Sequence, residues 1–156
     1  LANIDTRRNM SMKPNGKLDW DIFADHSSIL NWDVPNLPVI KMAQLFKDDG
    51  FKIVIFSGRN DRGFDATVQW LDSNDVPFDL LVMRPDKFKD KSWPIADGNP
   101  ATSDMRFMPD DKLKKVMLDT FINKDNVFCV FDDRKKVVDM WRQEGLTCFE
   151  VEEGNF

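Results

Sequence analysis

The chain lacks the features that mark membrane, disulfide-linked or zinc-binding proteins. No apolar run approaches the roughly 18 residues that a membrane helix needs, which excludes a helical membrane protein. The two cysteines, Cys129 and Cys148, lie within apolar runs and have no CxxC spacing. We therefore expect buried, reduced thiols in a cytoplasmic protein. The single histidine, His26, has no second histidine with which to share a metal.

The sequence also lacks an excess of positive charge. Its 22 basic and 27 acidic residues give a formal net charge of −5 over 156 residues. Binding along an extended nucleic acid needs many basic contacts, so this balance favours a local basic pocket that reads one phosphate. The length suits one compact domain, and a hydrophobic content of 42% is typical of a globular protein.

Apolar runs bounded by turn residues predict strands at 51–58, 78–83, 126–133 and 146–151. Apolar residues at helical spacing predict helices at 38–49, 62–74, 110–122 and 134–144. Strands that alternate with helices predict an α/β fold with a mainly parallel sheet covered on both faces. Two long irregular stretches, 8–34 and 84–109, are expected to form a small cap or active-site loops.

Polar residues follow two predicted strands at the carboxyl ends, where ligands bind in open parallel sheets. The first strand ends in Ser57-Gly58-Arg59 and the third in Asp132-Asp133. A hydroxyl, a glycine and a guanidinium can form an oxyanion cradle. Adjacent carboxylates repel each other, and a divalent cation is the usual remedy. Both together are what Mg²⁺-dependent phosphoryl chemistry needs.

Each motif also has a purely structural interpretation. Ser57-Gly58-Arg59 is compatible with a simple strand-to-helix turn, and an acidic pair before a helix stabilises the helix N-terminus. Lys114, in PDDKLKK, is a third candidate. It is either a cation that reaches over the site or a solvated lysine on an amphipathic helix. The occurrence of both motifs at one predicted sheet edge favours the functional interpretation.

Three stretches, IVIFSGRNDR, PDDKLKKVML and VFDDRKKVVDMWRQEGLTCFEVEEGNF, resemble the phosphatase domain of bacteriophage polynucleotide kinase/phosphatase. That domain belongs to the haloacid dehalogenase-like (HAD) superfamily. The resemblance implies a Rossmann-like sheet and a Mg²⁺-dependent phosphatase. Its substrates would be the 3′-phosphates of nucleic-acid ends or nucleotides, and its place the host cytoplasm if it is phage-encoded. No GxxxxGK[ST] phosphate loop is present, which excludes a kinase of that type within this chain.

The resemblance also implies roles for individual residues. Phosphate and substrate would be bound by Ser57, Gly58, Arg59 and Arg7. Lys114 and Asp132 would be catalytic. Asp133 would bind Mg²⁺ directly, with Asp132 as its support. A 5′-nucleotidase would use the same core with different loops and is the alternative activity.

The first motif of the family, DxDGT, is absent from the chain. Its first aspartate attacks phosphorus and its second is a general acid/base. In one register residues 3–5 (NID) are a degenerate copy, which makes the protein a catalytically dead nucleotide-binding pseudo-phosphatase. In the preferred register the motif precedes Leu1, and the chain is one HAD-like domain without its first strand. Three observations favour this register: the chain does not begin with Met, no apolar strand precedes Asn3, and Arg7 then matches a substrate-contacting arginine.

Overall fold

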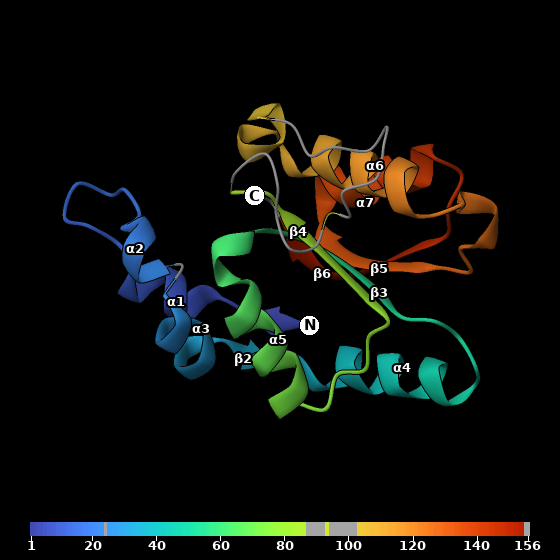
Figure 1. Cartoon of the computed structure of the whole chain (residues 1–156), viewed down its shortest axis with the longest axis horizontal. Coiled ribbons are helices and arrows are strands. Elements are labelled where there is room, and N and C mark those ends of the chain that lie inside the picture. The colour runs from blue at the N-terminus through green and yellow to red at the C-terminus, as the bar shows by residue number, and fades with distance from the viewer. Residues whose placement is uncertain (24, 87–92, 94–102, 155–156) are drawn as a thin grey trace. The chain divides into compact units, whose positions relative to one another are not determined.

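The computed structural model describes residues 1–23, 25–86, 93 and 103–154. Its helices are α1 (Asp5–Met10), α2 (Trp20–Phe23), α3 (His26–Trp32), α4 (Leu37–Asp48), α5 (Phe64–Ser73), α6 (Asp110–Phe121) and α7 (Lys135–Gln143). Short 3₁₀ helices cover Asp61–Gly63, Ser103–Phe107 and Lys124–Asn126. The strands are β1 (Ala2–Asn3), β2 (Val34–Pro35), β3 (Val54–Asn60), β4 (Leu80–Arg84), β5 (Val130–Arg134) and β6 (Cys148–Gly154) (Figure 1).

The described chain is an α/β protein that divides into two compact units. The first unit comprises Leu1–Ile55 and Arg59–Met83, and the second comprises Phe56–Gly58 and Arg84–Phe156. Strands β1 and β2 pair antiparallel, β3 pairs with β4, and β5 pairs parallel with β6. From α4 onward, helices alternate with strands along the chain. The predicted α/β class is therefore confirmed.

The core of the first unit forms around α5. This helix buries Ala66, Trp70 and Leu71 in one apolar cluster with Ile29 of α3 and Ile40 of α4. Apolar residues spaced three and four apart make one buried face on α5, as the sequence pattern predicted. The indole Nε1 of Trp70 donates to the backbone C=O of the residue before β2 at 3.2 Å, so its buried polar atom is satisfied.

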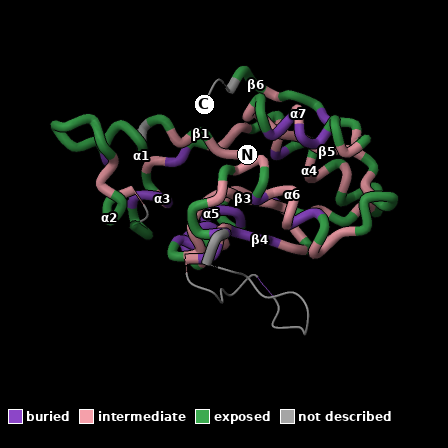
Figure 2. The backbone as a smooth tube through the Cα atoms, turned by 90° about the horizontal axis from the view of Figure 1, so that it is seen from above, coloured by how far each residue is buried: buried purple, intermediate pink, exposed green. Residues whose placement is uncertain are grey.

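The core of the second unit lies between α6, α7 and the β5–β6 pair. The α7 helix buries Val137, Val138 and Trp141 in a cluster that also includes Leu118 of α6. Figure 2 shows this buried face of α7 and the buried middle of β4. The chain leaves α7 through Gly145, whose φ of +82° is a conformation that glycine adopts without strain. It then enters β6 in register with β5.

The observed elements match the predicted ones in kind and differ at their ends. Strand β3 starts later than predicted because Ile53 bonds the side chain of Asp79 through its N–H and the backbone of Asp79 through its C=O. It also continues past Gly58 to Asn60, whose side chain then caps the following 3₁₀ helix. Strand β5 starts at Val130, later than predicted; of the predicted strand residues before it, only Asn126 belongs to the 3₁₀ helix that Asn123 caps.

The first of the two irregular stretches contains more regular structure than its sequence pattern indicates. Residues 8–34, expected as a cap or loops, contain the second half of α1 and all of α2 and α3. Local capping explains α3, because the Asp25 carboxylate accepts from the N–H groups of Ser27 and Ser28. Most of 84–109 lies outside the described residues. Trp93 is buried and packs edge-on against Phe121, with ring centroids 5.1 Å apart.

Candidate active site

The acidic pair lies at the carboxyl end of β5, and its two carboxylates have different surroundings. The Oδ1 atom of Asp132 accepts from the backbone N–H groups of Asp133 (2.9 Å) and Arg134 (3.4 Å). Its Oδ2 atom accepts from Lys114 Nζ (2.9 Å) and Trp141 Nε1 (3.1 Å). These four donors match the four acceptor positions of a carboxylate. Asp132 is therefore saturated by the protein.

Burial alone would raise the pKa of Asp132. The charge of Lys114 and the hydrogen bonds from Lys114, Trp141 and the backbone outweigh that effect and lower the pKa below its ordinary value. Asp132 is thus held as a carboxylate at neutral pH. A saturated, ionised acid suits the supporting role that the family resemblance gave it, while its role as a metal ligand stays a prediction.

The carboxylate of Asp133, by contrast, receives no hydrogen bond or ion pair from any residue that the structure describes. It is only half-buried, at the strand end where its neighbour is fully engaged. A carboxylate oxygen is the ligand type that Mg²⁺ prefers, and Mg²⁺ commonly takes only one or two carboxylates and keeps several waters. Asp133 therefore fits the direct metal contact. No group of three or more acids, histidines or cysteines in the described residues could hold a metal.

Lys114 reaches the acidic pair from α6. The helix begins at Asp110, so Lys114 lies just over one turn from its start. Its Nζ lies 2.9 Å from Asp132 Oδ2, and only 13% of its side chain is exposed. Of the two sequence interpretations for this lysine, the structure excludes a solvated lysine on a helix surface. Its catalytic role stays a prediction.

Gly58 lies where β3 approaches α6 most closely. A Cβ atom built on Gly58 would lie 2.6 Å from Oδ1 and 2.8 Å from Oδ2 of Asp110, closer than real Cβ contacts allow. The Gly58 carbonyl accepts from Arg84 Nε at 2.9 Å. Glycine is therefore required here by space and not only by turn geometry. Ser57 precedes it, half-buried in β3, and its role as a phosphate-binding hydroxyl stays a prediction.

Asp110 is a site residue that the sequence analysis missed. Its carboxylate accepts from Arg84 Nη2 and from Arg134 Nη1, each at 2.5 Å. Arg134 ends β5 and Gly58 lies within β3, so this one acid pairs with β5 and lies close to β3 within the second unit. In the sequence, an aspartate at the start of a predicted helix indicates only a helix N-terminus, which it also is. No sequence signal shows that two arginines from distant elements converge on it.

The two remaining candidates, Arg7 and Arg59, lie in the first unit and share one acid. Asp33 has a fully buried side chain; its Oδ1 accepts from Arg7 Nε at 2.7 Å and its Oδ2 from Arg59 Nη2. Burial lowers the pKa of Arg59, against the opposing charge of Asp33. Arg7 Nη1 donates to the Phe23 carbonyl. The structure brings the two arginines together, and sequence analysis did not identify Asp33.

The second terminal nitrogen of Arg7, Nη2, is buried and has no hydrogen-bond partner in the described part of the chain. Buried donors are almost always paired, so such an atom needs an explanation. An oxyanion would satisfy this donor, because it accepts hydrogen bonds and is attracted to a guanidinium.

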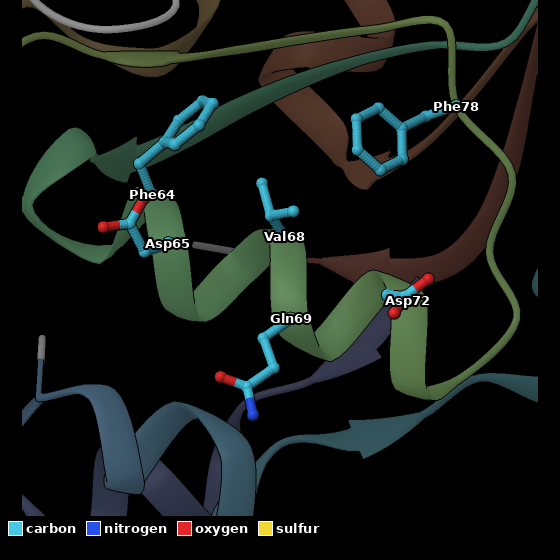
Figure 3. Close-up of a pocket in the computed structure, with 6 residues that line it drawn as sticks. All are labelled: Phe64, Asp65, Val68, Gln69, Asp72 and Phe78. Atoms are coloured by element: carbon cyan, nitrogen blue, oxygen red, sulfur yellow. The ribbon is translucent and has the colours of Figure 1, made fainter.

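A separate pocket of about 450 Å³ lies on α5 in the first unit. Figure 3 shows its six lining residues, of which α5 supplies all but Phe78. Its charged side chains are Asp65 and Asp72, and it has no basic residue, so it does not suit a phosphate. None of the predicted site residues lines it.

The α/β arrangement, with its parallel strand pair and alternating helices, is consistent with a HAD-like, Rossmann-type fold. The model of one family, the phosphatase domain of polynucleotide kinase PNKP, matches residues 23–156, and the chain belongs to this family. The predicted resemblance and the Rossmann-like fold class are confirmed. No sequence of a curated protein matches the chain.

Two solved structures are similar over nearly the whole chain. A chain in a structure of the Pnkp1/Rnl/Hen1 RNA repair complex is 29% identical, with a TM-score of 0.65 over 91% of this chain. A chain in a second structure of the Pnkp1/Rnl/Hen1 complex is 27% identical, with a TM-score of 0.69 over 100%. This chain spans 39% and 44% of their respective lengths. No described helix is long and apolar enough to cross a membrane.

Proposed function

We propose that the protein is a Mg²⁺-dependent phosphomonoesterase that removes the 3′-phosphate from nucleic-acid ends or nucleotides. The observation that carries the proposal is the state of the acidic pair at the end of β5. Asp132 is saturated by Lys114, Trp141 and the backbone, while Asp133 has no partner among the described residues. Membership of the PNKP phosphatase family supplies the reaction class.

The attacking group in this proposal is an aspartate upstream of Leu1, which would form an aspartyl-phosphate that water then hydrolyses. Asn3 is already used in another way: its Oδ1 accepts from the Asp5 N–H at 2.8 Å and starts α1. That turn supports the register in which Asn3 is not a replaced nucleophile. The chain spans less than half of its structural relatives, which leaves room for such a segment.

The residues of this chain hold the phosphoryl group and neutralise its charge. Asp133 would hold Mg²⁺, which when bound supplies positive charge next to the phosphoryl oxygens. Lys114 keeps Asp132 ionised and is itself a cation at this strand end. Ser57 and the glycine after it offer a hydroxyl and backbone N–H groups to the phosphate. The unpaired Nη2 of Arg7 supports its assignment, with Arg59, to substrate oxygens.

The decisive variant is Asp133→Asn in the complete gene product. We expect at least about 100-fold loss of Mg²⁺-dependent phosphatase activity, because a direct ligand matters more than the outer contacts that cost 10- to 100-fold. The measurement is phosphate release from a 3′-phosphorylated oligonucleotide over a Mg²⁺ titration, with a chelator as the zero point. Asp125→Asn, a change at an exposed acid in the same unit, is the matched control. Full activity of Asp133→Asn would refute the metal assignment.

The two alternatives are separated by substrate and by the upstream sequence. A 5′-nucleotidase would release phosphate faster from 5′-mononucleotides than from a 3′-phosphorylated oligonucleotide. A pseudo-phosphatase would release none from either, and the gene would show no DxDGT motif before Leu1. Similarity to a chain of an RNA repair complex favours nucleic-acid ends as the substrate for this chain.

A further inference from the structure

The chain between α1 and α2 forms a short hairpin that the proposed chemistry does not use. Met12 and Leu18 form an antiparallel bridge. The turn between them is closed by bonds from the Gly16 N–H to the Lys13 carbonyl (3.0 Å) and from the Lys13 N–H to the Lys17 carbonyl (2.8 Å). We define residues 8–23, this hairpin with α2, as the basic hairpin. In Figure 2 its tube is mostly exposed.

The charge of the hairpin is opposite to that of the chain. Residues 8–23 contain three basic and two acidic residues, a formal charge of +1, although the chain carries −5. The three basic residues, Arg8, Lys13 and Lys17, are exposed and make no ion pair with any described residue. The acids that follow are engaged, since Asp19 accepts from the N–H groups that start α2 and Asp21 lies 3.6 Å from Arg62.

The same hairpin exposes large apolar side chains. Trp20 is 60% exposed, Met10 58%, Met12 44% and Ile22 41%. The ring of Trp20 packs edge-on against the ring of Phe23, with the two ring centroids 5.5 Å apart. Phe23 in turn lies under the guanidinium of Arg7, 4.1 Å from its ring centroid, and its carbonyl accepts from the same arginine. An exposed tryptophan is thus anchored to the buried arginine–aspartate network of the first unit.

Exposed aromatic rings interleaved with unpaired cations are what single-stranded nucleic acids bind. Bases stack on the rings, which accept any base, and the cations contact the backbone phosphates. A purely apolar protein interface would not need three unpaired cations, and charged residues are depleted from the cores of such interfaces. The charge of the hairpin therefore selects a polyanion among the possible occupants.

We propose that the basic hairpin binds the single-stranded part of a polynucleotide substrate, with Trp20 stacking on a base and Arg8, Lys13 and Lys17 contacting phosphates. This inference rests on the proposed function and makes it more specific: the substrate is a polynucleotide end rather than a mononucleotide. The contacts are independent of the sequence of the strand, because stacking and phosphate contacts do not read base edges.

The test measures binding of the full-length protein to a fluorescent, 3′-phosphorylated single strand of about 12 nucleotides by anisotropy. We expect Trp20→Ala to weaken binding roughly 5- to 150-fold. The double variant Lys13→Glu/Lys17→Glu should weaken it further and lower the slope of log K against log salt by about 1.4. Hydrolysis of a 3′-mononucleotide should not change in either variant. Matched controls are Leu37→Ala, at a residue 68% exposed, and Lys41→Glu, both on α4.

Several results would overturn the inference. One is equal binding by the hairpin variants and their controls; another is wild-type protein that binds the oligonucleotide no more tightly than the 3′-mononucleotide. A dimer in light scattering that Trp20→Ala dissociates, without loss of strand binding, would assign the surface to a second copy. If the proposed function is wrong but the inference is right, the strand still binds through the hairpin while its 3′-phosphate is not released.

Discussion

Each compact unit contains one aspartate that joins two arginines, and the two acids differ in their exposure to water. In the first unit Asp33 is 0% exposed and joins Arg7 to Arg59. In the second, Asp110 is 23% exposed and joins Arg84 to Arg134. Both networks have one acid between two arginines, but water screens the charges only around Asp110. Because the charges match, a difference in stability between variants of the two networks reports the effect of burial.

Burial makes the Asp33 network sensitive to any loss of charge. Removing one member of a buried ion pair leaves the other charged in a medium of low dielectric constant, which costs far more than the pair contributes when it is intact. Around Asp110, partial exposure lets water stabilise the arginines if the acid is removed. The stability of the fold therefore depends more strongly on the acid of the first network, whereas the second can lose its acid at moderate cost.

The largest expected effect is the loss of Asp33. Asp33→Asn should lower the free energy of unfolding by about 3–5 kcal/mol, because it removes the buried counter-charge that two arginines share inside the first unit. Asp110→Asn should cost only about 1–3 kcal/mol, typical of hydrogen bonds between charged groups. Urea denaturation monitored by tryptophan fluorescence measures both. Equal losses in the two variants would show that exposure does not separate the networks.

A smaller effect is expected from Gly58→Ala, which tests the close packing around Asp110. The added methyl group would lie against a carboxylate that two arginines hold in place, at a cost of about 1–3 kcal/mol. The cost should shrink when Asp110 is also alanine, since the obstructing side chain is then gone. A double-mutant cycle on unfolding free energies gives this coupling. Additive losses would mean that Gly58 is needed for its backbone rather than for space.

The smallest change in stability is expected at Asp132, which pairs with one cation, Lys114, whereas Asp33 and Asp110 each pair with two. Its pKa is lowered in the folded protein, so it contributes stability above its unfolded pKa of about 3.9 that is lost as the pH falls through the folded value. Asp132→Asn should therefore be less stable than wild type at pH 7, with a difference that shrinks below pH 4 or so. Lys114→Met should reduce the pH dependence in an otherwise wild-type chain. If the difference in unfolding free energy between wild type and Asp132→Asn grew as the pH fell, the pKa of Asp132 would be raised rather than lowered in the folded protein.

The sequence predicted the elements well where apolar periodicity was strong. The helices α4 to α7 and the strands β3 to β6 all fall within the predicted ranges to within a few residues. It missed α1, α2 and α3 because these helices are short and have no long apolar stripe; the N-cap side chain of α3 bonds its first turn, whereas that of α1 does not. The sequence offered Lys114 either as a cation that reaches over the site or as a solvated lysine, and the structure places its Nζ 2.9 Å from Asp132.

What the sequence by itself determined is the α/β class, the two strands that carry Ser57, Gly58 and the acidic pair, and the family to which the chain belongs. The fold class, the strands and the family can be predicted because they depend on residues that are close together in the sequence. Only the tertiary structure decided that Asp132 is saturated while Asp133 is not, and that Asp33 and Asp110 each hold two arginines. The ion pairs of Asp33 and Asp110 join residues that are 24 to 26 positions apart in the sequence. The bond between Lys114 and Asp132 joins a helix to a strand. Such contacts form only when packing brings the elements together.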